Sequence, residues 1–282
     1  MEKKTEPPAH TGSNAISLRE KRIGFADCPV GAMMGSEELL GIGIKRAGRN
    51  FKVSLLEGNA GTEPPAWKRT LAKLVEEKVV LEPEEGKALI EKEGDVLLYD
   101  VLNLSKSVPS LVEIDKRTGI ACDVTVLRHG VISTGGFGEL FPTYGHAHEA
   151  KLGEIYSVIA GNGYLLQYWP ETNLTRAVKM GKGDEHYIPP GWIHRFYCGT
   201  EGVVVAGFVP HAAGHDYGAV KGKGFPYHIF YDVLRNETIF RHNPNFGPAQ
   251  LNAVEAQKNP IGAIARYVSA PEGLRALLET QD

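Results

Sequence analysis

Between residues 96 and 210 the chain alternates short runs of strand-forming residues with turn residues. The runs are rich in β-branched, aromatic and other apolar residues, and they cover residues 96–102, 121–127, 155–160, 164–167 and 203–209. Gly, Asn and Pro are prominent in the intervening segments 161–163, 181–183 and 189–191. Many short strands at fairly regular spacing are typical of a sandwich or a barrel. We therefore predict an all-β domain.

Apolar residues at helical spacing predict helices on both sides of this β-rich region. The first helix begins after Thr62, with two prolines in its first turn. Its packing face consists of Trp67, Leu71, Leu74 and Val75. We predict further helices at residues 84–91 (ending at Gly94), 251–256 and 274–279, the last capped by Ser269.

Composition and charge exclude several classes of protein. The net charge is 31 − 34 = −3, whereas a nucleic-acid-binding protein would carry a basic excess. The uncharged stretch 155–170 is interrupted by Gly, Asn and Pro and is shorter than the roughly 20 apolar residues of a membrane span. The first fifteen residues contain no apolar signal-peptide core. Cys28, Cys122 and Cys198 stand far apart, so we expect a reducing cytoplasm rather than a disulfide framework.

Three histidines and a glutamate occur at spacings that suit a single site. His146 and His148 are two residues apart, so on a strand both side chains point to the same face. Glu154 and Tyr156 share a face for the same reason. His194 follows a Pro-Pro-Gly turn that starts another strand. We expect these faces to meet inside a barrel.

Three imidazoles and one carboxylate suit a borderline transition metal such as Fe, Mn, Ni, Zn or Cu. With neutral imidazoles, a divalent cation and one carboxylate leave a residual charge of +2 − 1 = +1, which attracts an anionic or enolate-like species. An octahedral ion would also keep two adjacent positions for neighbouring substrate oxygens. The pattern therefore predicts a metal site that is open to a ligand.

The two segments resemble the two motifs of the cupin superfamily. The second motif (a Gly, five residues, Pro-x-Gly, two residues, then His) is met by Gly183, Pro189, Gly191 and His194. The first motif is met by His146, His148, Glu154 and Gly161. Cys198 stands in place of the usual closing Asn of the second motif. The resemblance implies an all-β cupin fold, a jelly-roll-like barrel, with flanking helical segments.

Beyond the two cupin motifs, the chain has the string Ala-Gly-His-Asp-Tyr-Gly at 213–218, which a generic cupin does not have. With this string, about residues 65–247 are similar to the cupin-type glucose-6-phosphate isomerases first described in archaea. On this basis we predict an N-terminal extension at 1–60, partly disordered, and a cupin isomerase domain at 61–247. Residues 248–282 would form a C-terminal helical tail.

The same resemblance implies a set of site residues. The implied ligands of a divalent transition metal are His146, His148, Glu154 and His194. Fe(II) is the expected metal, with Mn, Ni or Zn as alternatives. The implied contacts to the sugar phosphate are Thr125, Thr143, Gly145 and His215, with Tyr217 supporting that end of the site. The family also implies a cytoplasmic homodimer that acts in glycolysis and gluconeogenesis, without a nucleic-acid or membrane partner.

The implied reaction moves a proton between C2 and C1 of a hexose phosphate through an enediol or enediolate. Glu154 is the natural base, and Tyr156 is a second catalytic candidate, for which core packing with a satisfied hydroxyl is an equal alternative. A direct hydride shift from C2 to C1 would need no base. Two other functions remain open, namely a cupin dioxygenase with the same ligands and a non-catalytic sugar-binding cupin.

Overall fold

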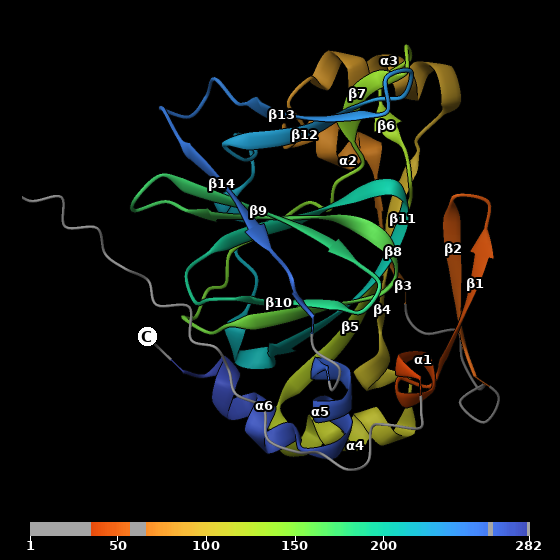
Figure 1. The fold of residues 1–282 in the computed structure, drawn as a ribbon, viewed down its shortest axis with the longest axis vertical. Helices are drawn as coiled ribbons and strands as arrows, with labels where there is room; N and C mark the ends of the chain where they lie inside the picture. The colour runs from red at the N-terminus through yellow and green to blue at the C-terminus, as the bar shows by residue number, and fades with distance from the viewer. Residues whose placement is uncertain (1–34, 57–65, 259–261, 281–282) are drawn as a thin grey trace, which may run out of the picture.

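A computed structural model describes residues 35–56, 66–258 and 262–280, and strands predominate in it (Figure 1). The largest sheet consists of β3 Ala66–Thr70, β4 Leu97–Asn103, β5 Ile120–Leu127, β8 Glu154–Trp169, β9 Leu174–Gly181, β10 Asp184–Ile188, β11 Ile193–Pro210, β14 Gln250–Glu255 and β15 Gln257–Lys258. A smaller sheet consists of β6 Val131–Ile132, β7 Phe137–Leu140, β12 Tyr227–Asp232 and β13 Glu237–His242. A separate hairpin is formed by β1 Ile42–Ala47 and β2 Asn50–Leu55.

Helices lie at both ends of the barrel (Figure 1). The α-helices are α1 Ser36–Leu39, α2 Leu71–Glu76, α3 Pro83–Glu93, α4 Pro109–Thr118, α5 Ala263–Ser269 and α6 Pro271–Leu278. Short 3₁₀ turns are η1 Leu104–Lys106, η2 His211–Ala213 and η3 Tyr217–Ala219. The predicted all-β barrel with flanking helical segments is therefore confirmed. Among the described residues, no helix combines the length and apolar character needed to cross a membrane.

Two long antiparallel strands, β8 and β11, form the wall that positions the site. Their register shifts between Cys198 and Val203 and again between Val204 and Val205, which are irregularities that bend the pair. Gly161 has a positive φ of 77°, and a Cβ there would lie 1.9 Å from the carbonyl oxygen of Gly202. The turn predicted at 161–163 is therefore wrong: the glycines bend one continuous strand instead of ending it.

Alternating residues of β5 separate the barrel interior from the helices. Cys122 and Val124 belong to an apolar cluster with side chains of α4, α5 and α6. Asp123 and Thr125, which alternate with them, line an internal cavity. The Tyr267 hydroxyl on α5 donates to the Ile120 carbonyl at 2.9 Å and fixes this helix layer on the strand. One face of β5 therefore stabilises the fold while the other is free for a ligand.

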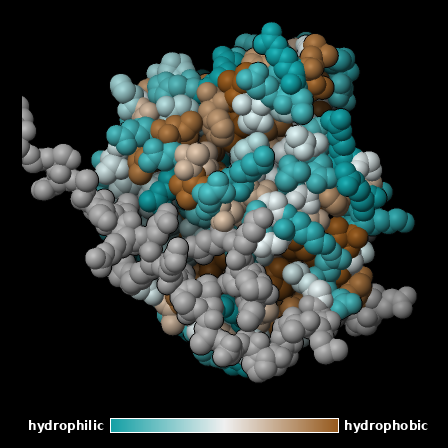
Figure 2. All heavy atoms as spheres, viewed as in Figure 1, coloured by the Kyte–Doolittle hydropathy of each residue, from teal (hydrophilic) through white to brown (hydrophobic). Residues whose placement is uncertain are grey.

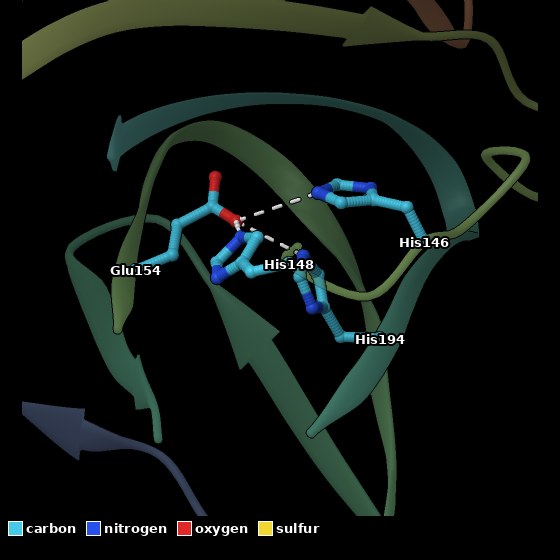
Figure 3. A group of neighbouring side chains, drawn as sticks. All are labelled: His146, His148, Glu154 and His194. Carbon is cyan, nitrogen blue, oxygen red and sulfur yellow. Dashed lines mark hydrogen bonds and ion pairs between the residues drawn. The ribbon is translucent and has the colours of Figure 1, made fainter. Parts of the chain in front are cut away.

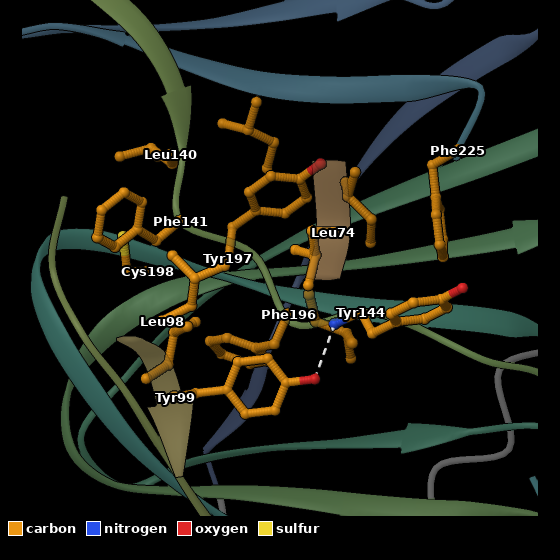
Figure 4. Packing of buried hydrophobic residues seen from close by; sticks show 14 of the residues in the cluster. Leu74, Leu98, Tyr99, Leu140, Phe141, Tyr144, Phe196, Tyr197, Cys198 and Phe225 are labelled. Atoms are coloured by element: carbon orange, nitrogen blue, oxygen red, sulfur yellow. Dashed lines mark hydrogen bonds between the residues drawn. The ribbon is translucent and has the colours of Figure 1, made fainter. Parts of the chain in front are cut away.

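A second apolar cluster fills the other end of the barrel (Figure 4). Tyr99 and Phe196 pack there, and the Tyr99 hydroxyl accepts a hydrogen bond from the Tyr144 N–H at 3.1 Å. On the outside, hydrophilic side chains are interspersed with small apolar groups (Figure 2), as is usual for a globular surface. The interior is thus closed at one end and hollow near β5.

The structure confirms some of the predicted helices and corrects others. Residues 84–91 lie within α3, which ends before Gly94, and residues 274–278 lie within α6. The predicted helix after Thr62 is wrong at residues 66–70, which form β3 because their backbone pairs with β4; residues 62–65 lie outside the described residues. Leu71, Leu74 and Val75 are buried on α2, whereas Trp67 is 43% exposed on β3.

The C-terminal segment contains a strand where a helix is predicted. Residues 251–255 belong to β14, which pairs in parallel with β9, so backbone bonding at a sheet edge overrides the apolar spacing. Ser269 does not cap α6: it is the last residue of α5, its hydroxyl donates to the Ala265 carbonyl, and α6 starts after Ala270. The tail beyond 248 is therefore part strand and part helix. The division into extension, domain and tail stays a prediction, and the disorder predicted at the start falls outside the described residues.

Candidate metal centre and cavity

The four predicted metal ligands come from three segments that meet inside the barrel. His146 and His148 lie in the connection between β7 and β8, Glu154 begins β8, and His194 is the second residue of β11. The backbones of His146 and His194 exchange two hydrogen bonds, at 3.0 and 2.9 Å. The turn before β11 thus brings His194 directly opposite His146, as the sequence predicts.

All four ligand atoms lie within 4.8 Å of one another. Glu154 Oε2 lies 2.9 Å from His194 Nε2, 3.3 Å from His148 Nε2 and 3.9 Å from His146 Nε2. In Figure 3 the three rings converge on this one oxygen, while the other carboxylate oxygen points away from them. Side chains that are distant in the sequence thus form one cluster.

Backbone carbonyls orient two of the imidazoles. Nδ1 of His148 lies 2.7 Å from the Leu152 carbonyl oxygen, and Nδ1 of His194 lies 3.3 Å from that of Trp192. A carbonyl only accepts, so each Nδ1 carries a proton, and Nε2 is the ring nitrogen that faces the cluster. Metal-binding histidines are commonly held by such an outer hydrogen bond.

Burial and mutual contacts set the protonation of the cluster. Burial and the neighbouring His194 hold the pKa of His146 well below its usual range. Burial alone would raise the pKa of Glu154, but the contacts and charges of His148 and His194 together outweigh it and the pKa is lowered. For His148, burial is the largest cause and lowers the pKa, but the Glu154 hydrogen bond, the Glu154 charge and the Leu152 carbonyl together outweigh it, so the pKa is raised. The carboxylate is therefore ionised, and a bound cation would replace the proton shared with His148.

The donor set fits a divalent transition metal. In the described part of the chain, His146 Nε2 and His194 Nε2 are buried and have no partner with hydrogen-bond geometry, although His194 Nε2 is close to Glu154. Buried polar atoms without partners are rare in native proteins and indicate a missing ligand or ion. Three neutral imidazole nitrogens and one carboxylate are the ligands that first-row transition metals prefer.

A cavity of about 390 Å³ opens beside the cluster. It contains every residue for which the sequence implies a substrate contact, together with the catalytic candidates: Thr125, Thr143, Gly145, Glu154, Tyr156, His215 and Tyr217. A volume of this size accommodates a small ligand such as a hexose phosphate. The roles assigned to these residues stay predictions, but the structure brings them together.

Thr143 and Gly145 line the cavity, and each carries a hydrogen-bond donor. The Thr143 hydroxyl oxygen accepts from the Phe196 N–H at 2.9 Å, which leaves its own O–H able to donate. Gly145 has a φ of 84°, and a Cβ would lie 2.8 Å from the ring of Phe225 and 2.9 Å from Cβ of Arg195. Glycine is therefore required here, and within the described residues the Gly145 N–H has no hydrogen-bond partner.

The aromatic residues of the site pack around the histidines. The His215 and Tyr217 rings are stacked, with centroids 6.0 Å apart and an interplanar angle of 11°. The His215 ring lies 4.5 Å from that of His146. Tyr156 meets the His194 ring edge to face at 5.7 Å. Burial and the Glu154 charge raise the pKa of Tyr156 well above its usual value, so its hydroxyl stays protonated.

Sequence reasoning missed several residues of the cavity. They are Trp67, Tyr99, Val101, Asn103, Lys106, Asp123, Tyr144, Val205 and Gly207. Asp123 could have been found, because it is two residues before Thr125 and so shares its face on a strand. Trp67 could not, because its spacing to Leu71 and Leu74 predicts a helix packed on the core. Both residues extend the site beyond the metal cluster.

Comparisons with known proteins were made against families, curated proteins and solved structures. A family model described as glucose-6-phosphate isomerase matches residues 70–239. A glucose-6-phosphate isomerase of Thermococcus litoralis is 28% identical over 181 residues, which cover 64% of this chain and 88% of that protein. One of Thermococcus gammatolerans is 34% identical over 164 residues, covering 57% of this chain and 79% of that protein.

Among solved structures, a single-substitution variant of the oxalate decarboxylase of B. subtilis matches with a TM-score of 0.30 and 17% identity. That match covers 42% of this chain, and it spans only 25% of the decarboxylase chain.

Proposed function

Because the chain belongs to the glucose-6-phosphate isomerase family, we propose that it interconverts glucose 6-phosphate and fructose 6-phosphate at this cavity. The membership confirms the resemblance inferred from the sequence and the prediction of an enzyme, an aldose–ketose isomerase. One observation carries the proposal: four metal-ligand side chains converge on the wall of a cavity that also holds donors suited to a phosphate. The proposed pathways are glycolysis and gluconeogenesis.

His146, His148, Glu154 and His194 would hold the metal, with Fe(II) expected and Mn, Ni or Zn as alternatives. When bound, such an ion supplies Lewis-acid polarisation of the sugar carbonyl, which makes the proton on the neighbouring carbon more acidic. The chain contributes the positions of these side chains, fixed by the His146–His194 backbone pair and by the outer hydrogen bonds of His148 and His194.

Glu154 is the proposed base. It is ionised at neutral pH because the histidine contacts lower its pKa against the opposing effect of burial. Its two oxygens have different surroundings: Oε2 faces the histidines, whereas Oε1 lies toward Gly207, where a Cβ would approach it to 2.9 Å. We assign Oε1 the transfer of the proton between C2 and C1. Each transfer passes through the carboxylic acid form and regenerates the carboxylate, so the base is unchanged after a turnover.

Thr125, Thr143, Gly145 and His215, which all line the cavity, are the proposed contacts to the sugar phosphate. The Thr143 hydroxyl and the Gly145 N–H can both donate to a phosphate oxygen. Phosphate binding by hydroxyls and backbone N–H groups does not require a cluster of cations. Tyr217, stacked on His215, would keep that ring in place.

Tyr156 has a proposed catalytic role as a hydrogen-bond donor. Tyr156 lines the cavity, its hydroxyl stays protonated, and its ring contacts His194 of the cluster. A phenol that cannot ionise stabilises negative charge that develops on a substrate oxygen. We further propose a cytoplasmic homodimer, which light scattering in solution would test.

The decisive experiment couples elemental analysis to an assay of fructose 6-phosphate conversion, with and without a chelator. We expect one divalent ion per chain, activity that disappears with the chelator, and recovery on adding Fe(II), Mn, Ni or Zn. Full activity in metal-free protein would refute the metal dependence. Oxygen consumption instead of isomerisation would indicate a dioxygenase, and binding without turnover would indicate a sugar-binding cupin.

Heavy water separates the two ways of moving hydrogen. If Glu154 carries the proton, it exchanges with solvent, and deuterium enters C1 of fructose 6-phosphate or C2 of glucose 6-phosphate. A direct hydride shift would transfer the original hydrogen without exchange. Product without deuterium at either carbon would therefore remove the proton-transfer role from Glu154.

A further inference from the structure

Asp123 lies on the same face of the sheet as Tyr156, in a row of paired residues that crosses four strands. Asn103 on β4 pairs with Asp123 on β5, Asp123 pairs with Gly207 on β11, and Gly207 pairs with Tyr156 on β8. Directly paired residues project to the same face of a sheet. Each of these residues lines the cavity, as does Glu154. The row therefore places a second carboxylate inside the site.

Gly207, the residue between Asp123 and Tyr156 in this row, makes room for the Glu154 carboxylate. A Cβ on Gly207 would lie 2.9 Å from Glu154 Oε1 and 3.2 Å from the ring of Tyr156. With glycine at this position, the Glu154 carboxylate and the Tyr156 ring come close to the backbone of the strand that pairs with Asp123. Gly207, Asp123 and Glu154 all line the cavity.

Asp123 lacks the contacts of a structural carboxylate. Oδ1 is buried and, among the residues that the structure describes, has no hydrogen-bond partner. Lys106 and His211 lower the pKa of Asp123 from a distance, but neither forms an ion pair with it within 4.0 Å in the described structure. Asp123 also lies outside the four-residue metal cluster. Its oxygen is thus available to a ligand.

The surroundings of Asp123 also show that its charge destabilises the folded protein. Burial is the main cause that raises its pKa to about 6, and the Glu154 charge adds to it. A buried, partly repelled carboxylate destabilises a fold unless something satisfies it. Functional sites are where such groups are usually kept.

We propose that Asp123 accepts a hydrogen bond from a hydroxyl of the bound sugar and so selects a polyhydroxylated chain over a deoxygenated one. This inference rests on the proposed function and adds a specificity residue to it. A carboxylate only accepts and a sugar hydroxyl donates, so the pair is complementary without any change of covalent bonds. The hydroxyl involved is one at C3 or C4, since O1 and O2 belong to the reacting end.

The test compares Asp123→Ala and Asp123→Asn with the unaltered, metal-loaded protein. A hydrogen bond to a charged group corresponds to a roughly ten- to hundredfold change in affinity. We expect D123A to raise the KM for fructose 6-phosphate, and the Kd of a linear hexitol 6-phosphate measured by calorimetry, by that factor, with kcat reduced less. D123N keeps a carbonyl acceptor and should lie in between. Metal content should be unchanged in both variants.

Two controls make the result specific. Asp100 on the neighbouring strand pairs with Val126 and alternates with the cavity residues Tyr99 and Val101, so it faces away from the cavity, and D100N should leave KM and Kd unchanged. Substrate analogues lacking the 3- or 4-hydroxyl provide the second control. The analogue without the contacted hydroxyl should bind the unaltered protein as weakly as it binds D123A.

The outcomes separate this inference from the proposed function. If the unaltered protein converts fructose 6-phosphate and D123A has the same KM and Kd, the assignment of Asp123 is overturned and the function stands. If D123A loses metal, Asp123 supports the metal cluster and the assignment is again overturned. If the unaltered protein neither binds nor converts hexose phosphates, the proposed function has failed, and this inference fails with it.

Discussion

Two buried glutamates of this barrel, Glu139 and Glu154, differ in how their oxygens are satisfied. Both Glu139 oxygens accept hydrogen bonds: Oε2 from the Leu81 N–H at 2.8 Å, and Oε1 from the Tyr197 hydroxyl at 2.9 Å and His228 Nδ1 at 2.7 Å. Around Glu154, three imidazole nitrogens crowd one oxygen, and two of them lack a hydrogen bond in the described structure. The polar atoms around Glu139 therefore need no ligand to satisfy them, whereas those around Glu154 do.

Neighbouring residues of β11 show the same contrast. His194 and Arg195 are both 0% exposed, and they point to opposite faces of the strand. The Arg195 guanidinium donates to the carbonyls of Thr143 and Val79 and to the Tyr197 hydroxyl. A saturated polar network rigidifies a core, whereas an unsaturated one indicates a binding site. One strand therefore serves stability on one face and function on the other.

Removing an imidazole from the unsaturated cluster should have the largest effect on activity. We expect His194→Ala to lose the metal and to lower kcat/KM by about a thousandfold or more, because one of four ligands is gone. The melting temperature of the metal-free protein should change little. Elemental analysis, turnover and thermal unfolding check the three expectations.

The exposed His242 provides the control, since His242→Ala removes an imidazole outside the cluster. Retention of metal at full stoichiometry in His194→Ala would reject its assignment as a ligand.

Removing the carboxylate of the saturated network should affect stability instead. Glu139→Ala leaves Arg195 and His228 buried without their partner, and breaking such a pair costs about 3–5 kcal/mol. Glu154→Ala, measured in metal-free protein, should cost less because it leaves imidazoles that can be neutral. Denaturant unfolding of both variants makes the comparison, and equal losses of stability would contradict the distinction between the two clusters.

How far the sequence predicts this site depends on the spacing of each residue. His146 and His148 are two residues apart, as are Glu154 and Tyr156, and this is the two-residue period of a strand. The turn before residue 194 is encoded by Pro-Pro-Gly. These local signals suffice to predict the metal cluster. Asp123 was missed although the period reaches it, because no motif marks it; its significance depends on pairing with Gly207 on another strand.

The fold shows the same limit. Short local patterns correctly predict α3 and the strands β4 and β5. The segments 66–70 and 251–255 have apolar spacings compatible with a helix, and they become strands because β4 and β9 offer free edges to pair with. Such pairing is a tertiary effect that a local pattern does not contain.

Thr143 connects the two clusters, because its carbonyl binds Arg195 while its hydroxyl faces the cavity. We expect Thr143→Val to raise the KM for fructose 6-phosphate roughly tenfold, the loss of about one hydrogen bond, and to lower kcat less. The variant also removes the acceptor of the Phe196 N–H, so its stability must be measured alongside. Thr143→Ser keeps the hydroxyl and should restore KM; an unchanged KM in Thr143→Val would exclude Thr143 from phosphate binding.

The smallest expected effect is on the free energy of unfolding and concerns Asp123. Its carboxylate is neither fully hydrogen-bonded like that of Glu139 nor surrounded by histidines like that of Glu154. Burial, with the Glu154 charge, raises its pKa from 3.8 to about 6, so the folded protein binds this proton more tightly than the unfolded chain does. Asp123 therefore favours folding at low pH, and that contribution is lost as the pH rises through about 6. We expect Asp123→Asn to match the unaltered metal-free protein near pH 4 and to be about 1 kcal/mol more stable near pH 8, because Asn carries no charge to bury. Urea unfolding at both pH values measures this difference, and a difference that does not change with pH would show that Asp123 is solvated and not confined between Gly207 and the cavity wall.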